Sequence, residues 1–310
     1  MVRTPVRLSR RKAFLLAVVI AITAGALTLA YFYPKIVKAE APSLESKFRD
    51  LYSRNAEFRL AVDELRRLAL DPGVPYDENR AFTLFNSILK GLGLPEVDRL
   101  HFRYGKSVKA RAEKVPEPVA CRLPDDLNLV IVQPKLDVSA GNHLEKVYAC
   151  EYQLGSKRVV EVTLVFKNEK RPDRSLEDVW YEVWRLVAWG RSRDVETFFL
   201  VYEGGKAYVD FSGLALILKD TSGLRFISSI GSGGKGYFES AHETERWELS
   251  SARIVVYVNT YNHALGVKDN NPGMEKVVYE VAPRDVVVGR RIDAENEYSD
   301  LKYAGEIVSV

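Results

Sequence analysis

Cysteine, methionine and glutamine are the residues that this chain of 310 amino acids has least of. It contains two cysteines, two methionines and two glutamines, whereas charged residues make up 28% of the sequence. Few thermolabile residues and many charged ones are reported for the proteins of hyperthermophiles. The composition therefore favours a thermophilic source, although a codon bias of the lineage would produce the same balance.

The two cysteines, Cys121 and Cys150, lack the C-x-x-C spacing of redox motifs and zinc sites. Outside the cytoplasm an even pair of cysteines usually forms a disulfide. We therefore predict a disulfide between them, which would stabilise the fold by about 3–4 kcal/mol by closing the loop that separates them. Two buried free thiols are expected instead if this part of the chain is cytosolic.

Motifs that carry common enzyme chemistry are also missing. The chain has four histidines, and none has the H-E-x-x-H spacing of a zinc site. The glycine-rich residues 228–236 lack the order of a phosphate-binding loop, and there is no G-x-S-x-G nucleophile elbow. We therefore predict no metal and no cofactor.

Positive charge is concentrated at the N-terminus. Residues 1–12 contain five Lys or Arg and no acidic residue, so the remaining chain holds 40 basic and 42 acidic residues and has a net charge of −2. A nucleic-acid-binding domain needs a basic excess on its folded surface. The charge distribution therefore argues against nucleic acid as a partner.

Residues 13–33 form one apolar run without a charged side chain. As an α-helix this run is about 30 Å long, the thickness of the hydrocarbon core of a bilayer. The basic residues before it favour a cytoplasmic N-terminus, and the aromatic residues 31–33 suit the opposite headgroup region. We predict a single-pass cell-membrane protein that contacts the lipid bilayer through residues 13–33 and has an extracytoplasmic C-terminal domain.

A cleaved secretory signal is an alternative interpretation of this segment. Ala39-Glu40-Ala41 has the small-residue pattern of a cleavage site, but Pro42 directly after the scissile bond disfavours cleavage. Cleavage there would release the protein from the membrane.

The same segment, residues 9–34, resembles the leader of archaeal type IV pilins and related class III signal proteins. The basic residues 10–12 and Ala13 directly precede an apolar helix, and Pro34 follows about twenty residues later. The resemblance implies cleavage by a dedicated peptidase after Ala13, a helix kinked at Pro34 and assembly into a filament. The acidic residue that bacterial pilins carry early in this helix is missing here.

The pattern of apolar residues changes along the chain after the apolar run. It begins with helical apolar spacing and continues, from about residue 127, with short branched and aromatic runs that indicate antiparallel strands. We predict an α+β protein in which a short membrane-proximal helical hairpin precedes a β domain, built as a sandwich or a barrel. The predicted parts are a cytoplasmic basic tail (1–12), a transmembrane anchor (13–33), a stalk (34–46), a helical hairpin region (47–104), a proline-containing linker (105–126) and a β-rich extracytoplasmic domain (127–310).

Capping signals place the helices. The spacing predicts one helix over residues 44–70, begun by Ser43, and a second over residues 77–92, begun by Asp77. Residues 176–189 fit either a helix or a strand, and we favour a helix because Ser175 and the residue three positions later form a variant of the capping box.

The strands of the β domain are short and separated by turn residues. Gly155-Ser156 and Gly204-Gly205 are the strongest predicted hairpin turns. The predicted strands are 127–132, 147–154, 159–166, 195–202, 207–211, 214–218, 224–229, 254–259, 277–281 and 286–288.

The candidate site lies in the loop after the predicted strand 254–259. Asn262 and His263 follow this strand, and Asp269 begins a second cluster of turn-forming and oxygen-bearing residues. His263 would act as a general base or a metal ligand, oriented by Asp269 or by Asp194. The plainer interpretation is that Asn262 and His263 only end the strand and hydrogen-bond the loop.

These features predict a membrane-anchored extracytoplasmic module that binds another envelope protein or associates with itself, without catalysing a reaction. Its many Tyr and Trp residues support this prediction, because these side chains are enriched at the energetic centres of protein interfaces. One alternative is a pilin-like filament subunit processed after Ala13. The other is an extracytoplasmic hydrolase with a site around His263.

Overall fold

The computed structural model describes residues 42–71, 73–105, 120–172, 175–211, 229–230, 237–238 and 246–298. Outside these residues lie the predicted tail at 1–12, the predicted anchor at 13–33, both predicted cleavage sites (after Ala13 and after Ala41), most of the predicted stalk and linker, the predicted strand 214–218, and all but the last residue of the predicted strand 224–229. Within the described residues no helix is both long and apolar enough to cross a membrane.

Three helices form the first part of the described chain. One correction to the sequence prediction concerns Asn55, which adopts an extended conformation and divides the predicted helix 44–70 into two. Its side chain accepts a hydrogen bond from the N–H of Phe58 at 3.0 Å, so it serves as the N-cap of the second helix. Asp77 caps the next helix as predicted, accepting from the N–H of Arg80 at 3.0 Å. The helices are α2 (Leu44–Arg54), α3 (Ala56–Leu70) and α4 (Glu78–Gly91).

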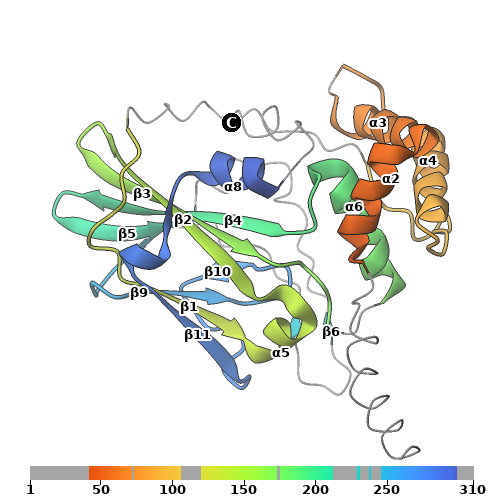
Figure 1. The fold of residues 1–310 in the computed structure, drawn as a ribbon. Helices are drawn as coiled ribbons and strands as arrows, with labels where there is room; N and C mark the ends of the chain where they lie inside the picture. The colour runs from red at the N-terminus through yellow and green to blue at the C-terminus, as the bar shows by residue number, and fades with distance from the viewer. Residues whose placement is uncertain are drawn as a thin grey trace, which may run out of the picture. The chain divides into compact units, whose positions relative to one another are not determined.

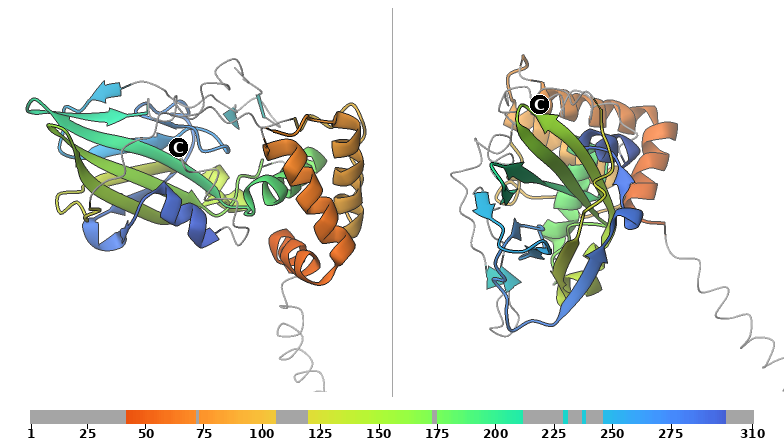
Figure 2. Two further views of the ribbon diagram at one scale, coloured as in Figure 1. Left: turned by 90° about the horizontal axis from the view of Figure 1, so that it is seen from above. Right: turned by 90° about the vertical axis from the view of Figure 1, so that its left-hand side faces the viewer.

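The ambiguous segment forms a helix, α6 (Leu176–Trp189), as the capping signal predicted. Ser175 caps it, and Gly190 ends it in the left-handed conformation with φ 72°. This helix packs on the preceding ones, since the rings of Phe85 in α4 and Trp184 meet edge to face. α6 thereby joins the helical layer, in which α4 lies at the outer edge, to the sheets (Figure 2).

A six-stranded sheet has the strand order β12-β2-β3-β4-β5-β8, and all its pairs are antiparallel except β12 with β2. The predicted turns at Gly155-Ser156 and Gly204-Gly205 join β2 to β3 and β4 to β5, and their glycines adopt positive φ. The strands are β2 (Leu144–Leu154), β3 (Lys157–Phe166), β4 (Asp194–Glu203), β5 (Lys206–Asp210), β8 (Arg246–Glu248) and β12 (Val287–Val288).

A four-stranded sheet has the order β10-β9-β1-β11, in which only β1 and β9 run parallel. Branched and aromatic side chains from both sheets make one apolar core, with Ile131 and Val256 from this sheet and Val162 and Phe198 from the other. The strands are β1 (Leu129–Pro134), β9 (Ile254–Val258), β10 (Leu265–Gly266) and β11 (Lys276–Val281); β6 (Ser229–Ile230) and β7 (Tyr237–Phe238) form a separate pair.

Short helices and the disulfide complete the fold. α8 (Arg291–Tyr298) covers part of the six-stranded sheet through Ala294, which packs on Val165 and Val195 (Figure 1). The predicted Cys121–Cys150 disulfide is confirmed. The remaining short elements are α5 (Lys135–Asp137), the π-helix η1 (Val138–Asn142) and the 3-10 helix η2 (Pro283–Asp285).

The protein is therefore a mixed α and β structure with two mostly antiparallel sheets. From Phe48 onward the helices and both sheets belong to one compact unit. The candidate site lies at the junction where the helical layer meets the strand ends of the two sheets, at the end of β3, the start of β4 and the ends of β1 and β9.

Candidate functional site

The loop after β9 is held in place by the asparagine that ends the strand. Asn259 donates through Nδ2 to the carbonyl of Lys268 at 3.0 Å and accepts through Oδ1 from the N–H of Asn270 at 2.9 Å. Its own N–H donates to the carbonyl of Ala264 at 2.9 Å, which closes a tight turn. This turn carries His263 on its inner side.

His263 is fully buried, with 0% of its surface exposed. Its φ of 49° is unusual for a residue other than glycine, and such strain persists only where the surroundings fix the residue firmly. The ring stacks on Phe166 at the end of β3, with ring centroids 3.8 Å apart and planes within 5° of parallel. The side chain is thus clamped rather than presented to solvent.

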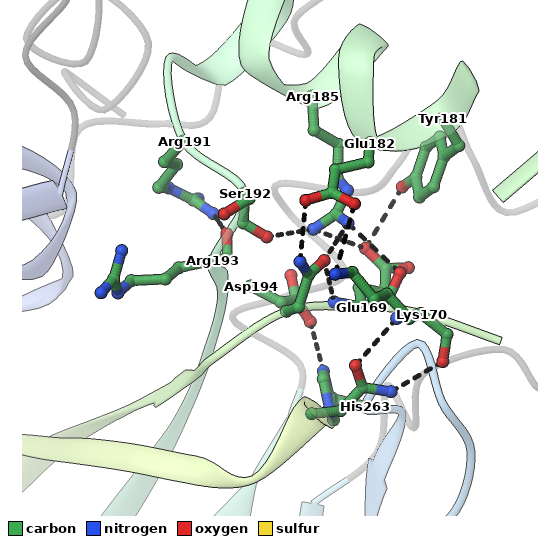
Figure 3. Close-up of polar contacts among 12 residues, drawn as sticks. Glu169, Lys170, Tyr181, Glu182, Arg185, Arg191, Ser192, Arg193, Asp194 and His263 are labelled. Carbon is green, nitrogen blue, oxygen red and sulfur yellow. Dashed lines mark hydrogen bonds and ion pairs between the residues drawn. The ribbon is translucent and has the colours of Figure 1, made fainter. Parts of the chain in front are cut away.

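Both ring nitrogens of His263 face a carboxylate. Nδ1 donates to Oδ2 of Asp194 at 2.8 Å, and Nε2 lies 3.5 Å from Oδ2 of Asp137, a distance typical of an ion pair without a close hydrogen bond. Asp194 begins β4 in the six-stranded sheet, whereas Asp137 follows β1 in the four-stranded sheet. His263 therefore connects one sheet to the other, and Figure 3 shows its contact with Asp194.

The two carboxylates keep the imidazole protonated. Burial alone lowers the pKa of His263, but the hydrogen bond to Asp194 and the negative charges of Asp137 and Asp194 together outweigh it and raise the pKa to about 10. Burial raises the pKa of Asp194, but the hydrogen bond from His263 and the positive charges of His263, Arg191 and Arg185 together outweigh burial and lower the pKa to about 2. At neutral pH the site holds an imidazolium between carboxylates, so His263 lacks the free nitrogen that a general base needs.

Two amide side chains donate hydrogen bonds to the carboxylate of Asp137. Gln133 donates to Oδ2 of Asp137 at 2.6 Å, and Asn142 donates to Oδ1 at 2.7 Å. Gln133 also donates to the carbonyl of Asn142 at 2.8 Å. Because all three residues are buried, these hydrogen bonds are required to offset the removal of their polar groups from water.

A second buried network connects the same junction to α6. Arg185 donates to Oδ1 of Asn168 at 2.6 Å, to the carbonyl of Glu169 at 3.2 Å and to the carbonyl of Ser192. Asn168 in turn donates to Glu182 at 3.0 Å. Figure 3 shows these α6 side chains converging on the loops at the ends of β3 and β4, on the side of Asp194 away from His263.

A third buried ion pair fixes α8 to the start of β4. Arg191 donates to both carboxylate oxygens of Glu295, at 2.7 and 2.8 Å. Burial raises the pKa of Glu295, but the charges of Arg191 and Arg291 outweigh it and lower the pKa below its usual value. Such a bidentate pair adds geometric specificity as well as electrostatic energy.

The three predicted candidates do not converge on one site. His263 meets Asp194, one of the two partners considered from the sequence. Asp269 instead pairs with Lys276 at 2.6 Å and accepts from the N–H of Asn271 at 2.9 Å. Asn262 accepts a hydrogen bond from the hydroxyl of Thr260 within the turn. The contacts of Asn262 and Asp269 lie within the loop after β9, whereas the ring of His263 contacts Asp194 in β4.

Several buried charged residues at this junction were not predicted from the sequence. Asp137, Arg185 and Arg191 have no motif spacing that links them to His263. One signal was available, because Arg185 stands within the apolar run of α6, where an unpaired charge would be costly. A charge in that position predicts a buried partner without identifying it.

A groove of about 670 Å³ lies between α3 and α4. Leu60, Ala61 and Leu84 provide its apolar lining, and the ion pair between Glu64 and Arg80 flanks it. It lies in the helical layer, whereas His263 lies at the ends of the sheets. The groove is therefore a separate candidate, suited to binding.

Two further searches bear on the site. Among the described residues, no group of three or more His, Cys, Asp or Glu side chains is arranged to hold a metal ion. Comparison of the whole chain with protein families, curated proteins and solved structures finds no match.

Proposed function

We propose that this protein is a membrane-anchored extracytoplasmic module that binds a protein partner or associates with itself, and that it catalyses no reaction. The observation that carries the proposal is the state of His263. Its buried ring stacks on Phe166, and its two nitrogens face the carboxylates of Asp137 and Asp194. Such an arrangement joins two sheets but offers no proton acceptor to a substrate.

The disulfide supports the extracytoplasmic side of the proposal. Cys121 precedes β1, and Cys150 lies in β2, so the bond connects the segment before the four-stranded sheet to strand β2 of the other sheet. Disulfides persist in oxidising compartments and are rare in the cytosol of mesophiles, whereas hyperthermophiles also keep them in intracellular proteins. The disulfide agrees with an anchor at 13–33 that leaves the folded part outside.

The groove between α3 and α4 supports the binding role. Both apolar and charged side chains line it, and one of its lining residues, Leu60, has 68% of its surface exposed. A helix laid in an apolar groove is a recurrent way in which proteins recognise one another. The module would therefore act through its helices, with the sheets as a rigid support.

Intact-mass measurement and N-terminal sequencing of the protein from native membranes, without reductant, test the anchored state. We expect the full chain with the disulfide intact. A chain that begins at Phe14 would replace the proposal with a pilin-type filament subunit. A chain that begins at Pro42 would indicate a secreted protein.

A hydrolase panel tests the catalytic alternative. We expect the purified full chain to show no turnover above that of the His263→Gln variant. Turnover that is lost in His263→Gln, while circular dichroism shows that this variant is still folded, would contradict the proposal and restore the candidate active site.

A further inference from the structure

One face of α3 carries a short stripe of surface residues. Glu57, Leu60, Glu64 and Arg67 are spaced three, four and three positions apart, which places them on one line along the helix. Leu60 is exposed at the middle of this line, and Glu57 and Arg67 are exposed at its ends. Neither end residue forms an ion pair or a side-chain hydrogen bond with another described residue.

The stripe borders the groove between α3 and α4. Ala61 and Leu84 line the groove, and the carboxylate of Glu64 is held by the guanidinium of Arg80 through hydrogen bonds of 2.8 and 2.6 Å. This internal pair neutralises the charge of Glu64. An apolar side chain that enters beside it therefore meets a paired carboxylate and two small or apolar side chains.

The stripe is complementary to a second copy of itself that runs in the opposite direction. In such an antiparallel pair Glu57 lies opposite Arg67 and Leu60 lies opposite Glu64, because both pairs of positions are symmetric about the same point of α3. Two copies of α3 in antiparallel contact would thus place each Glu57 opposite Arg67 of the other copy. The same contact places each Leu60 beside Glu64, at the edge of the other copy's groove.

We propose that two copies of this chain associate through their α3 helices about a two-fold axis, with Leu60 of each copy seated in the groove of the other. Two Glu57–Arg67 ion pairs close the ends of the contact. This inference rests on the proposed function, since it names the partner of the groove as a second copy. The two-fold arrangement is the commonest for homo-oligomers, because it uses one surface twice.

The predicted anchor is compatible with this symmetry. A two-fold axis perpendicular to the bilayer places both anchors on the same side of the contact, so that two chains in one membrane meet without inversion. Confinement to one membrane also raises the effective concentration of each copy for the other. A modest contact therefore suffices for association in the membrane.

Sedimentation velocity of the full chain in detergent micelles, over a range of protein concentrations, measures the association. We expect a monomer–dimer equilibrium and a dissociation constant raised at least about tenfold by Leu60→Gln, which removes the apolar side chain from both grooves. Leu100→Gln is the matched control, because Leu100 is also exposed, at 84%, and lies outside the groove. Its dissociation constant should equal that of the wild type.

Charge reversal identifies the antiparallel register. Glu57→Arg and Arg67→Glu each place like charges opposite one another at both ends of the contact, so each should weaken the dimer. The double variant Glu57→Arg/Arg67→Glu restores opposite charges and should recover most of the affinity. Glu96→Arg, at an exposed site away from α3, controls for a general effect of charge and should leave the dimer unchanged.

The outcomes separate this inference from the proposed function. A chain that stays monomeric at about 100 μM, or a dimer unaffected by Leu60→Gln and by both reversals, overturns the α3 contact. Weakening by the single reversals without recovery in the double variant overturns the antiparallel register. If the monomeric chain cross-links to a different protein in native membranes, the self-association fails while the binding function stands.

Discussion

The junction around His263 and the groove between α3 and α4 contain similar side chains used in opposite ways. At the junction, carboxylates, an imidazole and guanidinium groups are buried and paired with one another. In the groove, one ion pair lies at the surface beside an exposed leucine, and the charges at the two ends of the stripe face solvent. The histidine and carboxylates that resemble a catalytic site are thus buried and stabilise the fold. The leucine and charged residues of the groove resemble no catalytic site, and they are exposed.

The difference is explained by the cost of removing charges from water. A buried charge is tolerated only when a partner of opposite charge or several hydrogen bonds compensate it, so the junction has a fixed internal geometry. An exposed charge carries no such requirement and stays available to another molecule. Changes at the junction should therefore alter the stability of the fold, and changes in the groove should alter association.

The largest effect is expected from Asp194→Asn. The substitution keeps the size of the side chain but removes the nearer counter-charge of the buried His263, and we expect the free energy of unfolding to fall by about 3–5 kcal/mol. Urea denaturation of the full chain in micelles measures it. Asp50→Asn, in the exposed pair with Arg54, is the control and should cost less than about 1 kcal/mol. Equal losses in the two variants would remove the distinction between the regions.

The stability should also depend on pH through His263. Its pKa is raised from 6.5 to about 10 on folding, so its contribution is fully present below pH 6.5 and is lost as the pH rises through about 10. The two pKa values correspond to a loss of about 4–5 kcal/mol over this window, comparable to the effect of Asp194→Asn, because one pKa unit is worth about 1.4 kcal/mol. Urea midpoints between pH 6 and 10.5 measure it. A His263→Gln variant with an equally steep profile would assign the effect to other groups.

A smaller effect is expected from Arg80→Gln in the groove. Its ion pair with Glu64 is short and bidentate but half exposed, so its loss should lower the free energy of unfolding by less than about 1 kcal/mol. Urea denaturation under the same conditions measures this change. A loss above about 3 kcal/mol would show that the groove, like the junction, holds the fold together.

The smallest effect is the coupling between the two regions. The change in unfolding free energy for Asp194→Asn/Leu60→Gln should equal the sum of the two single changes within about 0.5 kcal/mol, because the sites share no contact. A double-mutant cycle in urea provides this value. Coupling well above that limit would indicate that the groove and the junction form one energetic unit.

The sequence predicted regular elements better than it predicted contacts. Most strands, both glycine turns and the helix at 176–189 follow from periodicity and local capping, which act over a few residues. The break at Asn55 was missed because the apolar spacing continues across it. Only the side-chain cap distinguishes one helix from two there.

Only part of the candidate site was predicted, because local sequence patterns do not reveal contacts between distant elements. His263 could be recognised as a notable residue and Asp194 as a partner, but Asp137 and Arg185 belong to distant elements with no shared spacing. Their meeting depends on how the two sheets and α6 come together. Periodicity contains no information on that arrangement.

The most direct test of this account is the titration of the imidazoles of the full chain by NMR, with the four histidines assigned by single substitution. We predict that His263 stays protonated from pH 5 to 8 and titrates near pH 10, because Asp137 and Asp194 enclose it. A His263 pKa near 6.5 would contradict the account, since it would mean that the ring is open to solvent and available as a base.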